Sequence, residues 1–300
     1  MGGQEHRGFL LLKFHRSHPR AGNFATHSRI LYRARLQGSN SMKLPKAMVV
    51  CSVCLLGLLV VANAEAQVSA ENRTPVLVEL FTSEGCSSCP PADVLLQKLV
   101  QLQPVPGAEI IALEEHVDYW NHDGWIDPFS SPEWTQRQQN YVALTNNQSY
   151  TPELVVDGST QFNGSDGPKA VEAIEKASRE TKVQVTITPE KNSHGVTVSV
   201  GPIPELGKDS AEVWFAITED GLHSQADAGE NKGRTLNHIA TLRSLHKIGT
   251  ADAHKPVSFS GDADVKINSR WNPGNLHVIV FVQSKKSRAI LGAASTKLQS

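Results

Sequence analysis

The stretch Phe81-Thr-Ser-Glu-Gly-Cys86-Ser-Ser-Cys89-Pro-Pro-Ala92 places two cysteines between an apolar run and a helical pattern. Residues 75–81 (Pro-Val-Leu-Val-Glu-Leu-Phe) are rich in apolar and β-branched side chains, which predicts a strand. Residues 92–102 repeat apolar side chains at helical spacing, and the two prolines before them suit a first helical turn. The cysteines therefore lie where a strand gives way to the N-terminus of a helix.

A Cys-x-x-Cys pair at such a junction indicates a thiol–disulfide redox site. Unpaired N–H groups and the helix dipole favour a negative charge there, and the thiolate is the form of cysteine that attacks a disulfide. Lowering a thiol pKa from about 8.5 to about 6 raises the ionised fraction at pH 7 from about 3% to about 90%. We expect Cys86 to be the solvent-facing nucleophile and Cys89 the resolving thiol. An inert structural disulfide is the alternative.

A leader sequence precedes this region. Residues 42–46 are basic, residues 47–62 are apolar or small, and Ala62-Asn-Ala64 is a small-x-small cleavage pattern. This order is that of a secretory signal peptide, and the apolar run is shorter than the roughly 20 residues that a membrane span needs. We expect residues 42–64 to be a signal peptide and residues 1–41 a non-native or disordered extension. The mature protein is then periplasmic or secreted, with no stable membrane span.

Charge and cysteine content narrow the class of protein. The full chain has a net charge of −1, but residues 1–41 carry seven Lys or Arg and one acid, and residues 42–64 carry two lysines. Cleavage therefore leaves a net charge near −9, which argues against a nucleic-acid partner. Cys51 and Cys54 lie in the leader. The single remaining pair is too few for a disulfide scaffold and closes too short a loop to stabilise the fold much, which favours reactivity.

The pattern of predicted helices and strands changes near residue 180. Before it, apolar runs and helical patterns give the order β-α-β-α-β-β-α, which is the order of the thioredoxin fold. After it, partly alternating runs separated by Gly, Pro and Asn predict an all-β unit. The predicted fold class is α/β, with a thioredoxin-like domain at residues 75–180 followed by a small all-β, sandwich-like domain at residues 181–300. The expected strands are 76–81, 109–113, 153–157, 160–164, 183–188, 195–200, 211–217 and 276–283, and the expected helices are 90–102, 131–145 and 168–179.

The residues around the cysteines also resemble a known family. The block 76–93, which contains Cys86-Ser-Ser-Cys-Pro-Pro-Ala-Asp93, is similar to domain-of-unknown-function family 1223, exported bacterial proteins with a thioredoxin-like fold. The resemblance covers nearly all of residues 75–283 and implies that fold and an exported location, but no reaction. Further matching segments are His116-Val-Asp-Tyr-Trp120, Gly124-Trp125, Arg137-Gln138, Tyr150-Thr-Pro-Glu153 and Gly229-Glu-Asn-Lys-Gly-Arg-Thr235.

The dipeptide Thr151-Pro152 stands before an apolar strand and about 60 residues after the cysteines. Thioredoxin-like folds hold a cis proline beside the active disulfide at this place, and a cis X–Pro bond costs only about 0.5–1 kcal/mol. The resemblance thus implies that the Thr151 backbone binds a substrate chain as an added strand. The chain departs from thioredoxins in having Ser87-Ser88 between the cysteines and no Trp before them, so the substrate and the redox potential stay open.

Two other segments invite a functional interpretation. His116-Val-Asp-Tyr-Trp-Asn-His122-Asp123 holds two His and two Asp that, with the thiolates, would suit Cu(I) or Zn, but the spacing matches no metal signature. Its aromatic residues either pack an insertion or form a lip over the disulfide. Residues 229–235 resemble a phosphate loop but lack its spacing, its lysine and its preceding strand, which favours a structured loop of the β domain. His238 and His246 carry no functional signal and are expected to be polar residues of the surface.

The sequence thus predicts an exported thiol–disulfide oxidoreductase that acts on protein or small-molecule disulfides through Cys86 and Cys89. We expect no cofactor, no metal ligands and no nucleic-acid partner, and the redox direction and redox partner stay open. One alternative is a copper or zinc chaperone or sensor that uses the same thiols. Another is a binding module whose cysteines form a resting disulfide.

Overall fold

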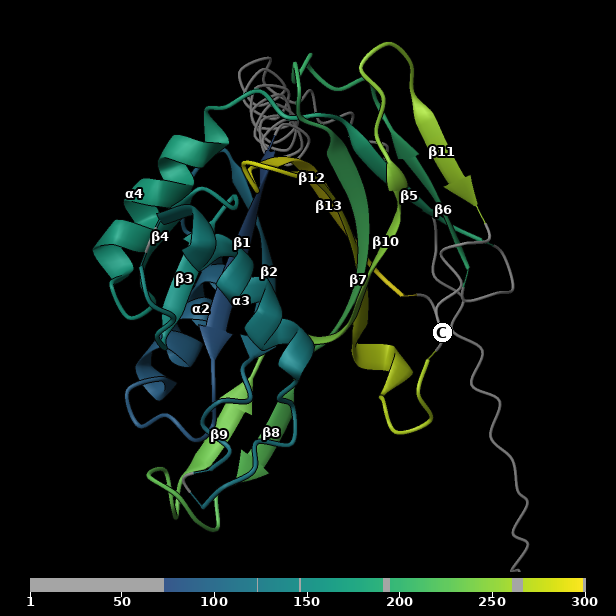
Figure 1. Cartoon of the computed structure of the whole chain (residues 1–300). Coiled ribbons are helices and arrows are strands. Elements are labelled where there is room, and N and C mark those ends of the chain that lie inside the picture. The colour runs from purple at the N-terminus through teal and green to yellow at the C-terminus, as the bar shows by residue number, and fades with distance from the viewer. Residues whose placement is uncertain (1–72, 123, 146, 191–194, 261–266, 299–300) are drawn as a thin grey trace, which may run out of the picture. The chain divides into compact units, whose positions relative to one another are not determined.

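The computed structural model describes residues 73–298 except 123, 146, 191–194 and 261–266 (Figure 1). The expected extension at 1–41 and the expected signal peptide at 42–64 lie outside these residues. Among the described helices, none is long and apolar enough to cross a membrane.

The elements expected around the cysteines are present. Strand β1 (Thr74–Thr82) runs parallel to β2 (Ala108–His116) and antiparallel to β3 (Glu153–Val156), which forms a hairpin with β4 (Thr160–Asn163). Helices α2 (Pro90–Leu102), α3 (Pro132–Thr145) and α4 (Gly167–Ser178) connect or follow these strands. The β-α-β-α-β-β-α order is therefore as expected.

The predicted fold class is nevertheless wrong. The four strands do not close a sheet of their own, because β2 is joined on its other side by β10 (Thr241–Thr250). A single mixed sheet of eight strands results, in the order β13-β12-β7-β10-β2-β1-β3-β4, with β7 (Ala211–Glu219), β12 (Leu276–Ser284) and β13 (Ile290–Lys297) beyond β10. The described chain is mostly β, with three α-helices, and is not a thioredoxin-like α/β fold.

The physical reason lies at the free edge of β2. An unpaired strand edge leaves N–H and C=O groups without partners. β10 pairs with this edge at Glu114, and β7, β12 and β13 continue the sheet beyond β10. The strands after residue 180 were expected to form a separate sandwich, but four of them extend this sheet instead. Two smaller sheets complete the fold: β11 (Val257–Ser260), β6 (Val196–Val200) and β5 (Val185–Pro189) form one, and β8 (Leu222–Gln225) pairs with β9 (Thr235–His238) in the other.

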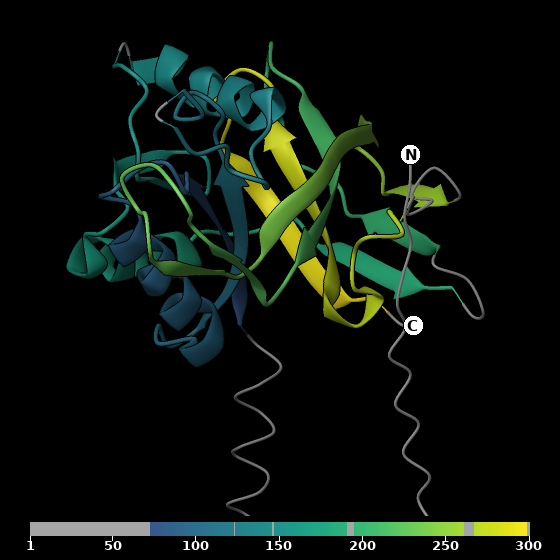
Figure 2. The same cartoon turned by 90° about the horizontal axis from the view of Figure 1, so that it is seen from below.

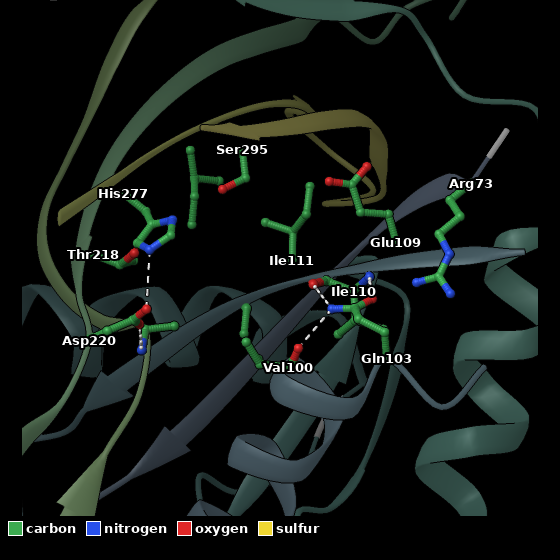
Figure 3. Close-up of a pocket in the computed structure, with 13 residues that line it drawn as sticks. Arg73, Val100, Gln103, Glu109, Ile110, Ile111, Thr218, Asp220, His277 and Ser295 are labelled. Atoms are coloured by element: carbon green, nitrogen blue, oxygen red, sulfur yellow. Dashed lines mark hydrogen bonds and ion pairs between the residues drawn. The ribbon is translucent and has the colours of Figure 1, made fainter. Parts of the chain in front are cut away.

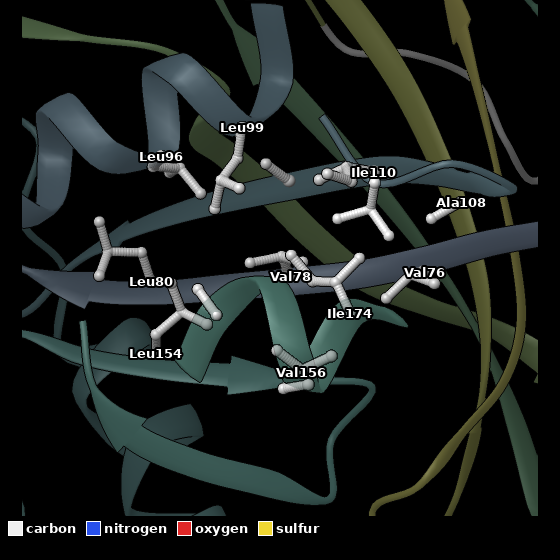
Figure 4. Packing of buried hydrophobic residues seen from close by; sticks show 14 of the residues in the cluster. Val76, Val78, Leu80, Leu96, Leu99, Ala108, Ile110, Leu154, Val156 and Ile174 are labelled. Atoms are coloured by element: carbon white, nitrogen blue, oxygen red, sulfur yellow. The ribbon is translucent and has the colours of Figure 1, made fainter. Parts of the chain in front are cut away.

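Alternation along β1 distributes apolar side chains to both faces of the sheet. Val76, Val78 and Leu80 pack against Leu96 of α2 and Ile174 of α4 (Figure 4). The opposite face carries Leu77, which clusters with Trp134 of α3 and with residues of β2, β7 and β12. Helices α2 and α4 thus cover one face near the cysteines, and α3 covers the other.

The three-stranded sheet packs on the C-terminal half of the large sheet. Val196, Val198 and Val200 of β6 belong to one buried cluster with Phe215 of β7 and Val280 of β12. Figures 1 and 2 show β5, β6 and β11 on the side of these strands away from the three helices. The sandwich-like packing expected after residue 181 therefore exists, but one of its two layers is the large sheet itself.

A charged side chain is buried under α3. The Arg137 guanidinium lies 2.5 Å from a Glu79 carboxylate oxygen and 3.3 Å from Glu115, and it donates to the Tyr141 hydroxyl at 3.1 Å. Burial lowers the pKa of Arg137, but Glu79, Tyr141 and Glu115 together outweigh this effect and raise it. Glu79 stands among the apolar residues of β1, so this ion pair is what allows a carboxylate at that position.

Candidate redox site

The two cysteines are joined by a disulfide at the beginning of α2. Their Cα atoms are 5.5 Å apart, and Cys89 is the N-cap residue of the helix. The Cys89 carbonyl accepts hydrogen bonds from the N–H groups of Ala92 and Asp93, and prolines occupy the first helical positions. The sequence therefore placed the pair correctly at a strand-to-helix junction. The Ser88 hydroxyl is 3.3 Å from Cys86 Sγ, and because a disulfide sulfur carries no hydrogen, the hydroxyl is the donor.

The sulfur atoms are less accessible than the sequence suggested. Cys86 is 1% exposed and Cys89 is 0% exposed, whereas Ser87 and Ser88 are exposed. The expectation that Cys86 faces solvent is wrong for the disulfide form. A remote part of the chain covers it, since Asn231 Nδ2 donates to the backbone carbonyl of Cys86 at 3.0 Å and to that of Glu84 at 2.8 Å.

The covering segment is the loop between β8 and β9. Glu230 accepts a hydrogen bond from the Ser87 N–H at 3.1 Å, while Asn231 is itself buried. The interpretation of residues 229–235 as a structured loop of the β domain missed this contact, which joins residues about 145 positions apart. The segment is therefore part of the site.

Trp120 connects Thr151 to the residue before Cys86. The Thr151–Pro152 peptide bond is cis, as expected. The Thr151 hydroxyl accepts a hydrogen bond from Trp120 Nε1 at 2.8 Å, and a Cβ on Gly85 would lie 2.9 Å from the Trp120 Cβ. Trp120 thus lies between Thr151 and Gly85, the residue before Cys86.

A network of buried ionisable side chains adjoins this loop. His238 Nε2 is 3.0 Å from Glu84 Oε1, and His238 Nδ1 is 3.2 Å from Glu114 Oε1. His116 Nδ1 is 2.7 Å from Asp127 Oδ2, and this carboxylate also accepts the Glu84 N–H at 2.8 Å. All five residues are at most 3% exposed.

Neighbouring residues hold the carboxylates of this network in place. Trp125 Nε1 donates to Glu84 Oε2 at 2.8 Å, and the Ser224 hydroxyl donates to Glu84 Oε1. The Thr241 hydroxyl donates to Glu114 Oε2 at 2.9 Å. The network therefore connects β2, the loop after it, the β8–β9 hairpin and the first residue of β10.

The charges of the network perturb one another. Burial lowers the pKa of His238, but the Glu114 and Glu84 carboxylates together outweigh burial and raise it to about 9. Burial raises the pKa of Glu114, but His238 and His116 together lower it to about 2. Burial also lowers the pKa of His116, and the Asp127 carboxylate raises it well above the ordinary value. Around neutral pH these contacts therefore favour protonated imidazoles against ionised carboxylates.

Asp93 behaves differently although it lies in the same region. It follows Cys89 by one helical turn, is 6% exposed, and accepts a hydrogen bond from the Thr82 hydroxyl at 2.7 Å. Burial, and after it the negative charge of Glu114, raise its pKa to about 7. Asp93 can therefore take up or release a proton near neutral pH.

The site is separate from the cavity shown in Figure 3. That cavity, of about 510 Å³, is lined by the C-terminal end of α2 and by residues of β2, β7, β12 and β13. The Asp220–His277 ion pair, 3.1 Å apart, borders it. Neither cysteine lines this cavity, so it is not the site predicted from the sequence.

Sequence reasoning found His116 but not its partners. His238 was interpreted as a surface residue, yet it is 3% exposed. Glu84, Glu114 and Asp127 were not singled out. In the sequence, Glu114 and Asp127 stand beside apolar residues, which could have indicated that their carboxylates are buried. Their proximity to His238 could not be predicted, because it depends on β9 lying near β2.

Comparison with known proteins places the chain in a family. Residues 77–283 match the family described as "Protein of unknown function (DUF1223)", which is more than half of the chain. The chain belongs to the DUF1223 family. No curated protein matches it.

Solved structures resemble this DUF1223 protein over most of its described length. Protein AGR_C_4864 from Agrobacterium tumefaciens is 25% identical with a TM-score of 0.59, covering 76% of this chain and 96% of that chain. HBP35 of Porphyromonas gingivalis is 13% identical with a TM-score of 0.53, covering 75% of this chain and 76% of that chain, and shows likeness of fold alone.

Proposed function

We propose that this DUF1223 protein is an exported thiol–disulfide oxidoreductase that works through Cys86 and Cys89. The observation that carries the proposal is the disulfide at the first turn of α2. A two-residue spacing closes too small a loop to contribute much to stability, so reactivity is the better explanation for the bond. The basic, apolar and small-residue order of residues 42–64 supports export to an oxidising compartment.

The exchange needs two steps. The Cys86 thiolate attacks a substrate disulfide, so a Cys86–substrate bond forms, the substrate S–S bond breaks and one substrate thiolate leaves. The Cys89 thiolate then attacks Cys86 Sγ, forming the Cys86–Cys89 disulfide and releasing the second substrate thiolate. The substrate gains two electrons and the protein loses two, and the reverse sequence oxidises a dithiol. Protein and small-molecule disulfides are the proposed substrates.

Local groups support the assignment of these roles. The Ser88 hydroxyl, 3.3 Å from Cys86 Sγ, would donate to a Cys86 thiolate and stabilise it. Asp93 lies one turn after Cys89 on the same helix, and residues at that spacing are neighbours on one helix face. With its pKa raised to about 7, mainly by burial, Asp93 is suited to accept the Cys89 proton in the second step.

Substrate access needs a movement at the covering loop. Cys86 is 1% exposed, and the contacts of Glu230 and Asn231 with residues 84–87 hold the loop over it. We propose that these hydrogen bonds open to admit the substrate. We further propose that the substrate chain lies along Thr151 and Pro152, which Trp120 links to the residue before Cys86.

Trapping the mixed disulfide tests the proposal. Reduced Cys89→Ser and Cys86→Ser proteins would each be mixed with glutathione disulfide and analysed by intact mass under non-reducing conditions. Cys89→Ser should accumulate a glutathione adduct that dithiothreitol removes, because the resolving thiol is absent. Cys86→Ser should accumulate little, and Ser87→Ala, with both thiols intact, should accumulate none. Equal adducts on both cysteine variants, or no adduct on either, would refute the assignment.

A further inference from the structure

Three donor side chains converge beneath the covering loop. Glu114 and His116 lie two residues apart on β2 and so point to the same face, and His238 is the last residue of β9. One ligand atom from each lies within 4.8 Å of the other two, and all three side chains are buried. Glu114 Oε1 is 3.2 Å from His238 Nδ1, and Glu114 Oε2 is 3.5 Å from His116 Nε2.

The second nitrogen of each imidazole is held by a different carboxylate. His116 Nδ1 contacts Asp127 Oδ2 at 2.7 Å, and His238 Nε2 contacts Glu84 Oε1 at 3.0 Å. Both rings therefore direct their remaining nitrogen toward Glu114. Metal-bound histidines are oriented in this way, with the non-ligating N–H on a carboxylate that fixes the ring and raises its basicity.

One atom at this position lacks a hydrogen-bond partner, although the Glu114 carboxylate lies 3.5 Å from it. Within the described part of the chain, His116 Nε2 is fully buried and makes no hydrogen bond. A buried polar atom without a partner is costly and rare in folded proteins. The unpaired His116 Nε2 therefore indicates that a bound group completes this cluster. Because Glu114 and His238 also direct donor atoms to the same place, that group should be one that several donor atoms can bind at once.

We propose that Glu114, His116 and His238 bind one divalent transition-metal ion, for which Zn²⁺ is the probe. A tetrahedral ion with bonds of about 2.0–2.1 Å holds its ligand atoms about 3.3 Å apart. Each imidazole nitrogen lies near this distance from one oxygen of the Glu114 carboxylate, His238 Nδ1 at 3.2 Å from Oε1 and His116 Nε2 at 3.5 Å from Oε2. Two imidazoles and a carboxylate suit Zn²⁺ better than Ca²⁺ or Mg²⁺, which prefer oxygen ligands alone. Three protein donors leave a fourth position for water.

The electrostatics of the network agree with a cation at its centre. In the ion pairs that the described residues form here, three buried carboxylates, those of Glu84, Glu114 and Asp127, face two imidazoles. A divalent ion would supply the positive charge that protons on both imidazoles otherwise supply. Because the ligands are buried, the ion should enter as the β8–β9 hairpin closes, and exchange in the folded protein should be slow.

Refolding in the presence of metal tests the site. The full-length protein would be unfolded in guanidinium chloride with a chelator, refolded with or without Zn²⁺, passed through gel filtration and analysed for bound metal. The expected result is about one Zn²⁺ per chain. His116→Gln and His238→Asn should retain almost none, and His223→Asn, which changes an exposed histidine of β8, should bind as the wild type does. Absence of bound Zn²⁺ in the refolded wild type, or binding that survives both ligand substitutions, would overturn the proposal.

Two further variants separate this site from the thiols and from misfolding. The Cys86→Ser/Cys89→Ser protein should keep its full Zn²⁺ content, and loss of the metal there would assign it to the cysteines instead. Asp127→Asn leaves the three ligands in place and removes only the charge that orients His116. It should bind the same amount of Zn²⁺ about 10–100-fold more weakly, as substitutions of such outer carboxylates do. The glutathione trapping experiment has its own outcome, so either proposal can fail while the other stands.

Discussion

Replacement of Asp93 by asparagine should change how stability depends on pH. The folded protein holds the Asp93 proton up to about pH 7, whereas the unfolded chain releases it near pH 3.8. The folded pKa is raised, so the contribution of Asp93 is fully present below the unfolded pKa and is lost as pH rises toward 7. In the Asp93→Asn variant the side chain carries no charge at any pH, and its amide oxygen can still accept the Thr82 hydrogen bond.

The size of the effect follows from the shift. Between pH 3.8 and about pH 7, each pH unit lowers the unfolding free energy of the wild type by about 1.4 kcal/mol relative to the variant. The upper limit for the whole range is about 4 kcal/mol. Urea unfolding followed by circular dichroism, with chelator present, gives the unfolding free energy of both proteins. Their difference should grow in favour of Asp93→Asn between about pH 5 and pH 7 and then level off.

The same comparison in a Cys86→Ser/Cys89→Ser background isolates the cause. Burial is the largest contribution to the Asp93 pKa, and it does not require the disulfide, so the trend should persist there. A free-energy difference that stays flat across this range, or that falls as pH rises, would refute the reasoning. It would also remove Asp93 as the proton acceptor of Cys89.

Three other substitutions test separate contacts. Ser88→Ala should raise the pKa of the Cys86 thiol in the reduced protein, because a donor to the thiolate is lost, and pH-dependent alkylation should show half-maximal rates at a higher pH. Arg137→Met should lower the free energy of unfolding by about 3–5 kcal/mol at neutral pH, since it leaves the Glu79 carboxylate buried without its partner. A loss below about 1 kcal/mol would contradict that account of the ion pair. Gly158→Ala should also destabilise the protein in urea unfolding, because its φ is +66° and the new Cβ would lie 2.0 Å from a carbonyl oxygen of the β12–β13 turn.

The sequence was informative wherever structure depends on near neighbours. The apolar runs and caps predicted β1, α2, α3, the β3–β4 hairpin and α4 to within a few residues. Strands such as β10 and β13 were missed, because Thr241–Thr250 alternates poorly and Ile290–Lys297 is rich in small residues. The predicted fold class was wrong for the same reason. The β-α-β-α-β-β-α unit was expected to have a sheet of its own, whereas β10 and β13 belong to the same sheet as its strands.

In the candidate redox site, too, the features set by residues near in sequence were predicted and those set by distant residues were not. The cis bond at Thr151–Pro152 was implied by the resemblance to thioredoxin-like folds, and the local pattern around Cys86 and Cys89 predicted the disulfide and its position at a helix N-terminus. It could not predict that Asn231 covers Cys86 or that His238 meets Glu114, because these contacts join residues 145 and 124 positions apart. Burial of His238 depends on where β9 lies and not on the polarity of its neighbours in sequence.

The junction between β2 and β10 has a consequence for how the large sheet tolerates change. β1 and β2 pair at nine positions, but β10 meets β2 at the single pair Thr241↔Glu114, supported by the Glu114 N–H on the Ala240 carbonyl at 2.9 Å. A long ladder of backbone hydrogen bonds is largely indifferent to side-chain identity, whereas this junction adds the side-chain bond from Thr241 to Glu114. The continuity of the sheet at this point therefore rests partly on the Glu114 side chain, so a substitution there should disturb the sheet more than one at an exposed position of the β1–β2 ladder.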